Sequence, residues 1–291
     1  VEVFRGNAPG YLGGAAIGGA INLVTDDAFL GSSSSGSVTD QGRFTIDGYT
    51  SAAPRVFKHQ HHVSAYVNAI VNRGRYRFYS DNGTPYNRID DARPIRKNNA
   101  SDAFHALFQW ETRINRGRLR IIDAWTTKHL ELPGHFNNED AFARLNTTRN
   151  LLGLQYDLGV DGHRAHLTGW WLSRSEQFDD QAGGLGLGQQ LILQKTTNLG
   201  LRAHDSFGIN EHLAIGLTGA VQAEFSSSED KLLGLGSASD NVYADHRRTS
   251  ETLTVDLPTT LGGLTFTPLV HGTFIQHSQS ISSTQFDPRV G

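Results

Sequence analysis

The sequence predicts an all-β protein, specifically a transmembrane antiparallel β-barrel. Three observations lead to this fold class. Several segments alternate strictly between apolar and polar residues, no apolar run reaches the length of a membrane-spanning helix, and tight turns alternate with long polar connections. Together they favour strands that cross a bilayer, with short turns on one side and long loops on the other.

The alternation is clearest between Leu213 and Phe225. Odd positions in this segment carry large apolar residues such as Leu217 and Val221, whereas even positions are small or polar. A segment of this length crosses a bilayer at the usual strand tilt of about 45°. The same period-2 pattern occurs in 104–114, 152–158 and 264–274. Pro268 weakens the centre of the last of these strands, because proline cannot donate to the ladder.

The composition fits a β-barrel better than a helical membrane protein or a nucleic-acid-binding protein. Hydrophobic residues make up 37% of the 291 residues, and the longest apolar runs stop well short of the roughly 18–20 residues of a spanning helix. The net charge of -3 lacks the basic excess that a nucleic-acid partner requires. The sequence contains no cysteine, which rules out disulfides and thiolate metal sites.

The connections between the predicted strands alternate in length. Short ones fall at 115–117, 159–162, 208–211 and 258–263. Long polar ones fall at 80–99, 133–146, 179–190 and 226–247. Outer-membrane barrels sort their connections in this way, because their periplasmic turns are tight and their extracellular loops are long. Aromatic residues near the expected strand ends, such as Trp170 and Trp171, indicate an interfacial girdle.

The first thirty residues differ from the remainder of the chain. Val1 to Phe4 predicts a short strand, Gly13-Gly14 and Gly18-Gly19 permit a compact bend, and Ile21 to Val24 predicts a second strand. A serine run at 32–35 then reads as a linker. The sequence therefore predicts a small, tightly turned element in front of the strand array.

Three motifs in this opening segment carry a resemblance to a known family. They are Val1-Glu2-Val3-Phe4-Arg5-Gly6, Tyr11-Leu12-Gly13, and the run AIGGAINLVT at 16–25. The segment resembles the end of the plug domain of TonB-dependent outer-membrane receptors, although Asn7 replaces the usual proline and Tyr11-Leu12 reverses the usual order. Weaker likenesses follow at 81–86, at Arg96-Lys97-Asn98-Asn99 and at Leu132-Pro133-Gly134.

The resemblance implies a barrel of about 22 strands filled by a plug. Residues 1–30 would be the C-terminal end of the plug domain, and 31–291 a partial transmembrane barrel with long extracellular loops. Roughly ten to twelve strands are predicted, about half of such a barrel, and an open sheet edge in lipid leaves unpaired backbone groups. We therefore expect the chain to be a fragment of a longer protein.

The resemblance also implies contacts between plug and barrel wall. Charged residues at this end of the plug pair with carboxylates on the inner wall in the family, which points to Glu2 and Arg5. If the odd positions of 213–225 face lipid, Glu224 points inward, and Glu111 does so by the same logic in its own strand. A contact between Arg5 and a barrel glutamate is therefore a hypothesis.

The function implied is energy-coupled uptake across the bacterial outer membrane. The small-molecule ligand would be a scarce compound, such as an iron chelate, a cobalamin-like compound or a glycan. The partners would be outer-membrane lipid and a TonB-type inner-membrane energy-coupling complex, which would act through an N-terminal box preceding Val1. The protein would bind and gate without catalysis, so no catalytic residue and no cofactor is expected.

Other clusters favour ordinary surface roles over chemistry. His59, His61 and His62 include two imidazoles on one strand face, a possible metal pair, but a polar strand end is the simpler interpretation, and no metal site is predicted. Asp90-Asp91 and Asp179-Asp180 are interpreted as solvated loop charges. Two rival functions stay open, namely a passive porin or adhesin barrel and a soluble all-β carbohydrate-active protein.

Overall fold

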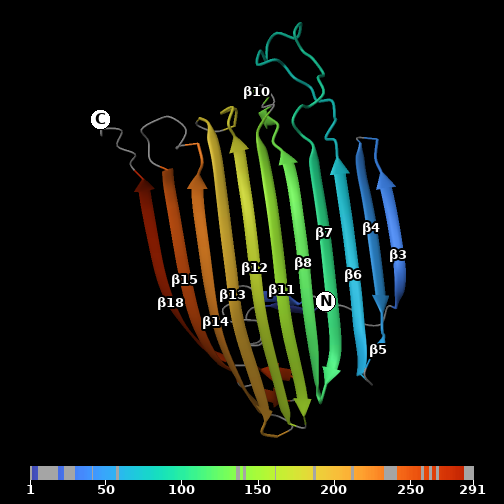
Figure 1. Ribbon diagram of the computed structural model, residues 1–291, viewed down its shortest axis with the longest axis vertical. Coiled ribbons are helices and arrows are strands. Elements are labelled where there is room, and N and C mark those ends of the chain that lie inside the picture. The colour runs from blue at the N-terminus through green and yellow to red at the C-terminus, as the bar shows by residue number, and fades with distance from the viewer. Residues whose placement is uncertain are drawn as a thin grey trace.

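The computed structural model describes residues 2–5, 19–22, 30–40, 42–56, 59–135, 138–139, 142–160, 162–185, 188–210, 213–232, 241–256, 259–261, 264–266 and 269–284. These residues form strands, turns and loops and contain no helix, which confirms the all-β prediction (Figure 1). Accordingly, no helix of these ranges is long and apolar enough to cross a membrane.

Eleven strands of eight or more residues and seven short ones make up the described part of the fold. They are β1 Glu2–Arg5, β2 Gly19–Asn22, β3 Gly31–Val38, β4 Arg43–Ala52, β5 Arg55–Val56, β6 His59–Asn72, β7 Ser101–Ile114, β8 Gly117–Glu131, β9 Gly134–His135, β10 Asn138–Glu139, β11 Arg144–Val160, β12 His163–Asp180, β13 Gln190–Gly208, β14 Ala214–Asp230, β15 Asn241–Asp256, β16 Thr259–Leu261, β17 Leu264–Phe266 and β18 Leu269–Thr284.

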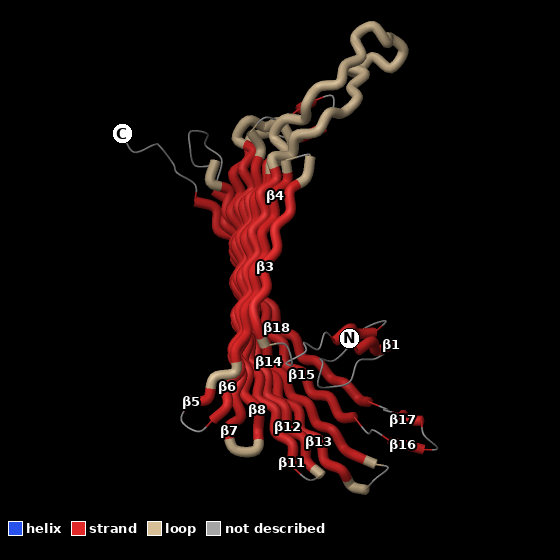
Figure 2. The backbone as a smooth tube through the Cα atoms, turned by 90° about the vertical axis from the view of Figure 1, so that its right-hand side faces the viewer, coloured by secondary structure: helices blue, strands red, loops and turns tan. Residues whose placement is uncertain are grey.

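One antiparallel sheet of twelve strands dominates the molecule. Its strand order is β18-β15-β14-β13-β12-β11-β8-β7-β6-β4-β3, with β5 paired to β6, so successive long strands are hydrogen-bonded neighbours. β3 and β18 form the two edges of this path. The pairs β1–β2, β9–β10 and β16–β17 are separate two-stranded sheets. Seen edge-on, the large sheet is a single twisted layer (Figure 2).

The register gives this sheet two chemically different faces. Residues directly opposite one another across antiparallel strands share a face, as do alternate residues along a strand. His204 lies opposite both His166 and Thr218, which places all three on one face. Leu201 lies opposite Gly169 and Val221 on the other. We call these the polar face and the apolar face.

Burial follows the two faces in a sense opposite to that of a soluble protein. On the polar face, Asn68 is 8% exposed and Thr218 only 3%, because neighbouring side chains crowd them. On the apolar face, Leu217 and Val221 are each 48% exposed. Among the described residues, Ala143 is the sole buried hydrophobic residue. The sheet therefore has no apolar core of the kind that two packed layers create.

The predicted strands are largely confirmed, with two corrections. β7, β11 and β14 contain the alternating segments expected at 104–114, 152–158 and 213–225. The single strand expected at 264–274 is wrong: β17 and β18 belong to different sheets, and Pro268, which cannot donate to a ladder, falls between them. The expected linker at 32–35 is also wrong, because these serines lie in strand β3.

The connections differ in length between the two ends of the sheet. Residues 115–116 and 161–162 connect strands at one end, whereas 73–100 and 132–143 connect them at the other. The loop expected at 226–247 is shorter than predicted, because β14 and β15 continue into it. The β3–β4 connection at 39–42 is short although it lies at the long-loop end.

The tryptophans do not lie at strand ends as expected. Trp170 and Trp171 occupy the middle of β12, which runs from His163 to Asp180. Trp170 belongs to the polar face, where its indole N–H donates to Asn198 Oδ1 at 2.8 Å. Its ring covers Gly200, whose position leaves no room for a side chain: an added Cβ would lie 2.1 Å from Trp170 Cζ2. The glycine thus accommodates the indole.

The β1–β2 hairpin lies apart from the large sheet. Its register pairs Glu2 with Asn22 and Arg5 with Gly19. Figures 1 and 2 show it to one side of the sheet and level with the half near the short turns. Residues 6–18 and 23–29 lie outside the described ranges, so the division into a plug end at 1–30 and a barrel at 31–291 stays a prediction.

Gly200→Ala is expected to lower the free energy of unfolding by about 1–3 kcal/mol, because the new methyl group must displace Trp170. Gly219→Ala is the matched control, since nothing lies within 4 Å of the Cβ it would add. Urea unfolding followed by tryptophan fluorescence measures both. Equal stability of the two variants would show that the indole does not depend on this glycine.

Candidate functional site

A charged belt crosses the polar face near the short-turn end of the sheet. It consists of Glu111 on β7, Arg118 and Arg120 on β8, Asp157 on β11 and His166 on β12. Arg120 donates to Glu111 Oε2 through Nε at 3.0 Å and Nη2 at 2.8 Å. Arg118 lies 3.8 Å from both Glu111 and Asp157, and so links the two carboxylates. His166 Nδ1 and Asp157 Oδ1 are hydrogen-bonded.

The register explains why five residues from four strands meet. Glu111 lies opposite Arg120, Arg118 opposite Asp157, and Asp157 opposite His166, so each strand contributes its polar-face residue to adjoining rows. Glu111 and Arg120 have side chains that are each only 14% exposed. Partly desolvated opposite charges of this kind hold one another in place more firmly than solvated pairs do.

Hydrogen bonds extend the belt toward β14. Thr168 and the Nε2 atom of His166 lie 2.8 Å apart, and Gln155 donates to Asp157 Oδ2 at 2.9 Å. On the next strands, His204 Nδ1 and Thr218 Oγ1 lie 2.7 Å apart. Nearly every polar group here therefore has a protein partner. Mutually paired charges and amides of this kind hold one another in fixed positions.

A second polar group lies nearer the centre of the sheet. Asn198 accepts the Trp170 indole N–H and donates to Glu224 Oε2 at 3.4 Å. The Arg202 guanidinium lies over the Trp170 ring, 5.6 Å from its centroid. On the same face, but near the other edge of the sheet, Asp47 of β4 accepts from Tyr66 at 2.9 Å and from Asn68 at 2.6 Å. The polar face is thus hydrogen-bonded across most of its width.

Four residues were predicted to make contacts between plug and barrel. Two of them share one face of the sheet but do not contact each other. Glu111 and Glu224 both lie on the polar face, as the alternation predicted, but each has its own partners. Glu111 is bound by Arg120, a contact that the sequence pattern did not single out. Glu2 and Arg5 lie in β1, and their side chains are outside the description, so their contacts stay a prediction.

The histidine cluster is divided between the faces. His62 bonds Ser51 Oγ at 3.0 Å on the polar face. His61, on the apolar face, bonds the Val56 carbonyl at 3.3 Å and stacks on Trp110. No group of three or more histidine and carboxylate side chains with metal-site geometry occurs in the described ranges.

The aspartate pairs are less solvated than expected. Asp180 is fully buried at the end of β12, where its two oxygens accept the N–H groups of Gly184 and Leu185, each at 2.9 Å. The interpretation as a solvated loop charge is therefore wrong for Asp180, which organises the following loop. Asp90 and Asp91 are likewise bound within their loop, by Thr84 and Tyr79.

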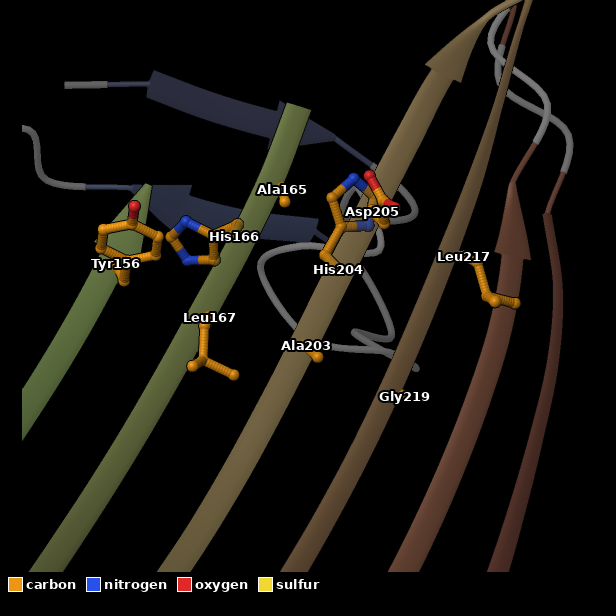
Figure 3. A pocket seen from close by; sticks show the side chains of 9 residues that line it. All are labelled: Tyr156, Ala165, His166, Leu167, Ala203, His204, Asp205, Leu217 and Gly219. Atoms are coloured by element: carbon orange, nitrogen blue, oxygen red, sulfur yellow. The ribbon is translucent and has the colours of Figure 1, made fainter. Parts of the chain in front are cut away.

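A shallow hollow of about 320 Å³ lies on β11 to β14 (Figure 3). Most of its lining belongs to the apolar face, where the small residues Ala165, Ala203 and Gly219 lie between larger neighbours. Asp205 at its rim is 3.4 Å from His163. The lining is largely apolar, so the hollow suits hydrocarbon better than a polar ligand.

The longest connection, residues 73–100, forms an arm that projects beyond the long-loop end (Figures 1 and 2). Its two sides pair as an irregular antiparallel ladder, with Ser80 and Ala92 exchanging both backbone hydrogen bonds at 2.9 Å. Asn98 fastens its base by donating to the carbonyls of Leu132 and Ala143, both at 2.8 Å. The arm is therefore an organised element of the long-loop end.

Side-chain hydrogen bonds also fix the tip of the arm. Thr84 Oγ1 donates to both oxygens of Asp90, at 2.9 and 2.8 Å. Tyr79 donates to Asp91 Oδ2 at 2.5 Å, and this hydrogen bond raises the pKa of the tyrosine hydroxyl above its ordinary value. Tyr86 and Ile89, between these bonds, are almost fully exposed. Exposed large side chains on an ordered loop are typical of a binding surface.

Comparison of the chain with models of known protein families and with curated proteins finds no match.

Glu111→Gln is expected to destabilise the protein by about 1.5–3 kcal/mol, because Arg120 loses a charged acceptor at a site that is largely shielded from water. Glu111→Leu combined with Arg120→Met should recover most of the loss, since the buried charge disappears with its partner. Arg118→Gln, at a 42% exposed side chain, is the control and should cost under about 1 kcal/mol. Chemical unfolding of the full-length protein measures all three, and a double variant as unstable as the single one would contradict the pairing.

Proposed function

We propose that the protein is a TonB-dependent receptor of the bacterial outer membrane, which imports a scarce ligand with energy supplied by an inner-membrane complex. The observation that carries the proposal is the inverted sheet: polar side chains are crowded and hydrogen-bonded on one face, and large apolar side chains are exposed on the other. In water an exposed apolar face of this kind is unfavourable in free energy, in proportion to its area. In a bilayer the face would contact hydrocarbon instead of water.

The strand lengths support membrane crossing. A tilted transmembrane strand needs about 9–11 residues. β7 has 14 residues and β13 has 19, so the strands are long enough to cross and to extend into water at one end. The arm and the other long connections lie at one end of the sheet, as extracellular loops do in outer-membrane barrels.

The edge strands support closure into a barrel. β3 and β18 each leave one side of their backbone without a partner in the described sheet. In hydrocarbon every unpaired N–H or C=O group costs several kcal/mol, so an open sheet is not a stable membrane structure. We therefore propose that further strands join these edges and that the polar face encloses the lumen.

The glycine-rich opening segment supports a plug within that lumen. The β1–β2 hairpin and the charged belt both lie toward the short-turn end, which would be periplasmic. A belt of fixed charges offers a docking surface for Glu2 and Arg5 of the hairpin. The alternative of a passive porin or adhesin leaves this segment unexplained, and a soluble carbohydrate-active protein leaves the apolar face exposed.

Val221→Lys is expected to destabilise the protein in lipid vesicles by about 2–4 kcal/mol, because a charge at the middle of a lipid-facing strand is costly. Gln222→Lys is the matched control: it is the next residue, on the polar face, and should cost under about 1 kcal/mol. Urea titration of full-length protein folded into phosphatidylcholine vesicles compares them. Equal losses at the two positions would contradict the lipid-facing assignment.

Uptake is expected to depend on the proton-motive force. Cells producing the full-length protein would be given radioactive iron chelates, cobalamin or labelled oligosaccharides, with and without a protonophore. Accumulation of the accepted compound should stop with the protonophore and on deletion of the energy-coupling complex, while binding at the cell surface continues. Accumulation that continues under both conditions would identify a passive channel instead.

A further inference from the structure

From the charges of the arm, and resting on the proposed function, we infer that the imported ligand is anionic and that arginines of the arm capture it through carboxylate or phosphate groups. Between Arg73 and Lys97 the arm carries seven basic and three acidic residues, a net charge of +4 in a chain whose overall net charge is -3. The positive charge is therefore local, and the remainder of the chain is acidic.

The acidic side chains of the arm are occupied within the arm itself. Asp81 accepts the N–H of Gly83 at 3.1 Å. Asp90 accepts two contacts from Thr84, and Asp91 accepts from Tyr79. These carboxylates shape the tip, so little of their hydrogen-bonding capacity is directed at the neighbouring arginines.

Five arginines of the arm are exposed and form no ion pair with any carboxylate in the part of the chain that the structure describes. They are Arg73, Arg75, Arg77, Arg88 and Arg93. A guanidinium presents a planar fork of donors that matches carboxylate and phosphate oxygens. Because they are exposed and have no carboxylate partner among the described residues, these groups can bind an anion without first breaking an ion pair.

The ladder of the arm places several of these cations close together. Arg77 is paired with Ile95 in the backbone ladder, and its Nη1 reaches the Arg93 carbonyl at 3.4 Å. The same register sets Arg75 opposite Lys97 and Tyr79 opposite Arg93, so basic residues of both sides fall on one side of the ladder. A cluster of this kind attracts a multiply charged anion more strongly than single cations do.

The position of the arm connects this cluster with the import path. In Figure 2 the arm leans toward the side of the sheet on which the β1–β2 hairpin lies. In the proposed receptor the hairpin belongs to the plug, so the arm overhangs the outer opening of the lumen. Tyr79 is partly exposed and lies on the same side of the ladder as Arg77 and Arg93, where its ring adds a face beside the cations.

The test measures binding of two radioactive iron complexes to outer membranes that contain the full-length protein: ferric citrate, which is anionic, and an uncharged ferric trihydroxamate. The triple variant Arg75→Gln/Arg77→Gln/Arg93→Gln should weaken ferric citrate binding at least about tenfold. Raising the salt concentration should weaken wild-type binding and affect the variant much less. Arginine-to-lysine replacement at the same three positions should restore part of the affinity.

The matched control is Arg55→Gln/Arg116→Gln/Arg164→Gln, which removes the same charge from exposed positions at the short-turn end and should leave binding unchanged. Ferric citrate that fails to bind, binds equally to both triple variants, or binds more weakly than the trihydroxamate would overturn the inference. So would an arm that binds vesicles of anionic phospholipid without competition from citrate.

The test also separates this inference from the proposed function. Uptake of an uncharged ligand that depends on the proton-motive force would support the proposed function and contradict the inference. Charge-dependent binding without such uptake would support the inference and contradict the proposed function.

Discussion

The register of the antiparallel hydrogen-bond ladder is the constraint on which the remainder of this structure depends. Because side chains alternate between faces, a slip of one residue between neighbouring strands would move every polar side chain of one strand to the apolar face. The long, uninterrupted pairing of β11 with β8 and β12 keeps Asp157 beside Arg118 and His166. The charged belt is thus both a product of the register and a reason for it, since a slipped strand would separate the charges.

A sheet organised in this way obtains its specificity from polar contacts. Ordinary domains bury apolar side chains and leave charges in water, whereas here Arg120 and Glu111 are shielded and Leu217 is exposed. Shielded charges without partners are expensive, so the polar face must be satisfied nearly completely. The close bonds at Asp47, Glu111, Asp157 and Asn198 meet this requirement across the width of the sheet.

The alternation of residue types was sufficient to predict the all-β class, most long strands and the face on which Glu111 and Glu224 lie. The alternation did not predict the register, that is, which residues of neighbouring strands lie opposite one another. The pairing of Arg118 with Asp157 was therefore missed. The aspartate at 180 and the serines of β3 were misread because local polarity does not report burial or strand pairing. The basic residues of the arm were visible in the sequence, but the absence of a carboxylate partner at five of its arginines, within the residues that the structure describes, required the structure.

The strand order of the large sheet follows the order of the chain, and this has a consequence for how the protein forms. Each long strand pairs with the one made just before it, so assembly can advance hairpin by hairpin, with loop closures that are short on average. The arm is the largest interruption, since β6 and β7 must find one another across residues 73–100. The entropic cost of closing a loop rises only with the logarithm of its length. The long connection therefore slows the pairing of β6 with β7 very little. Evolution is accordingly free to enlarge such a loop without endangering the wall that carries it.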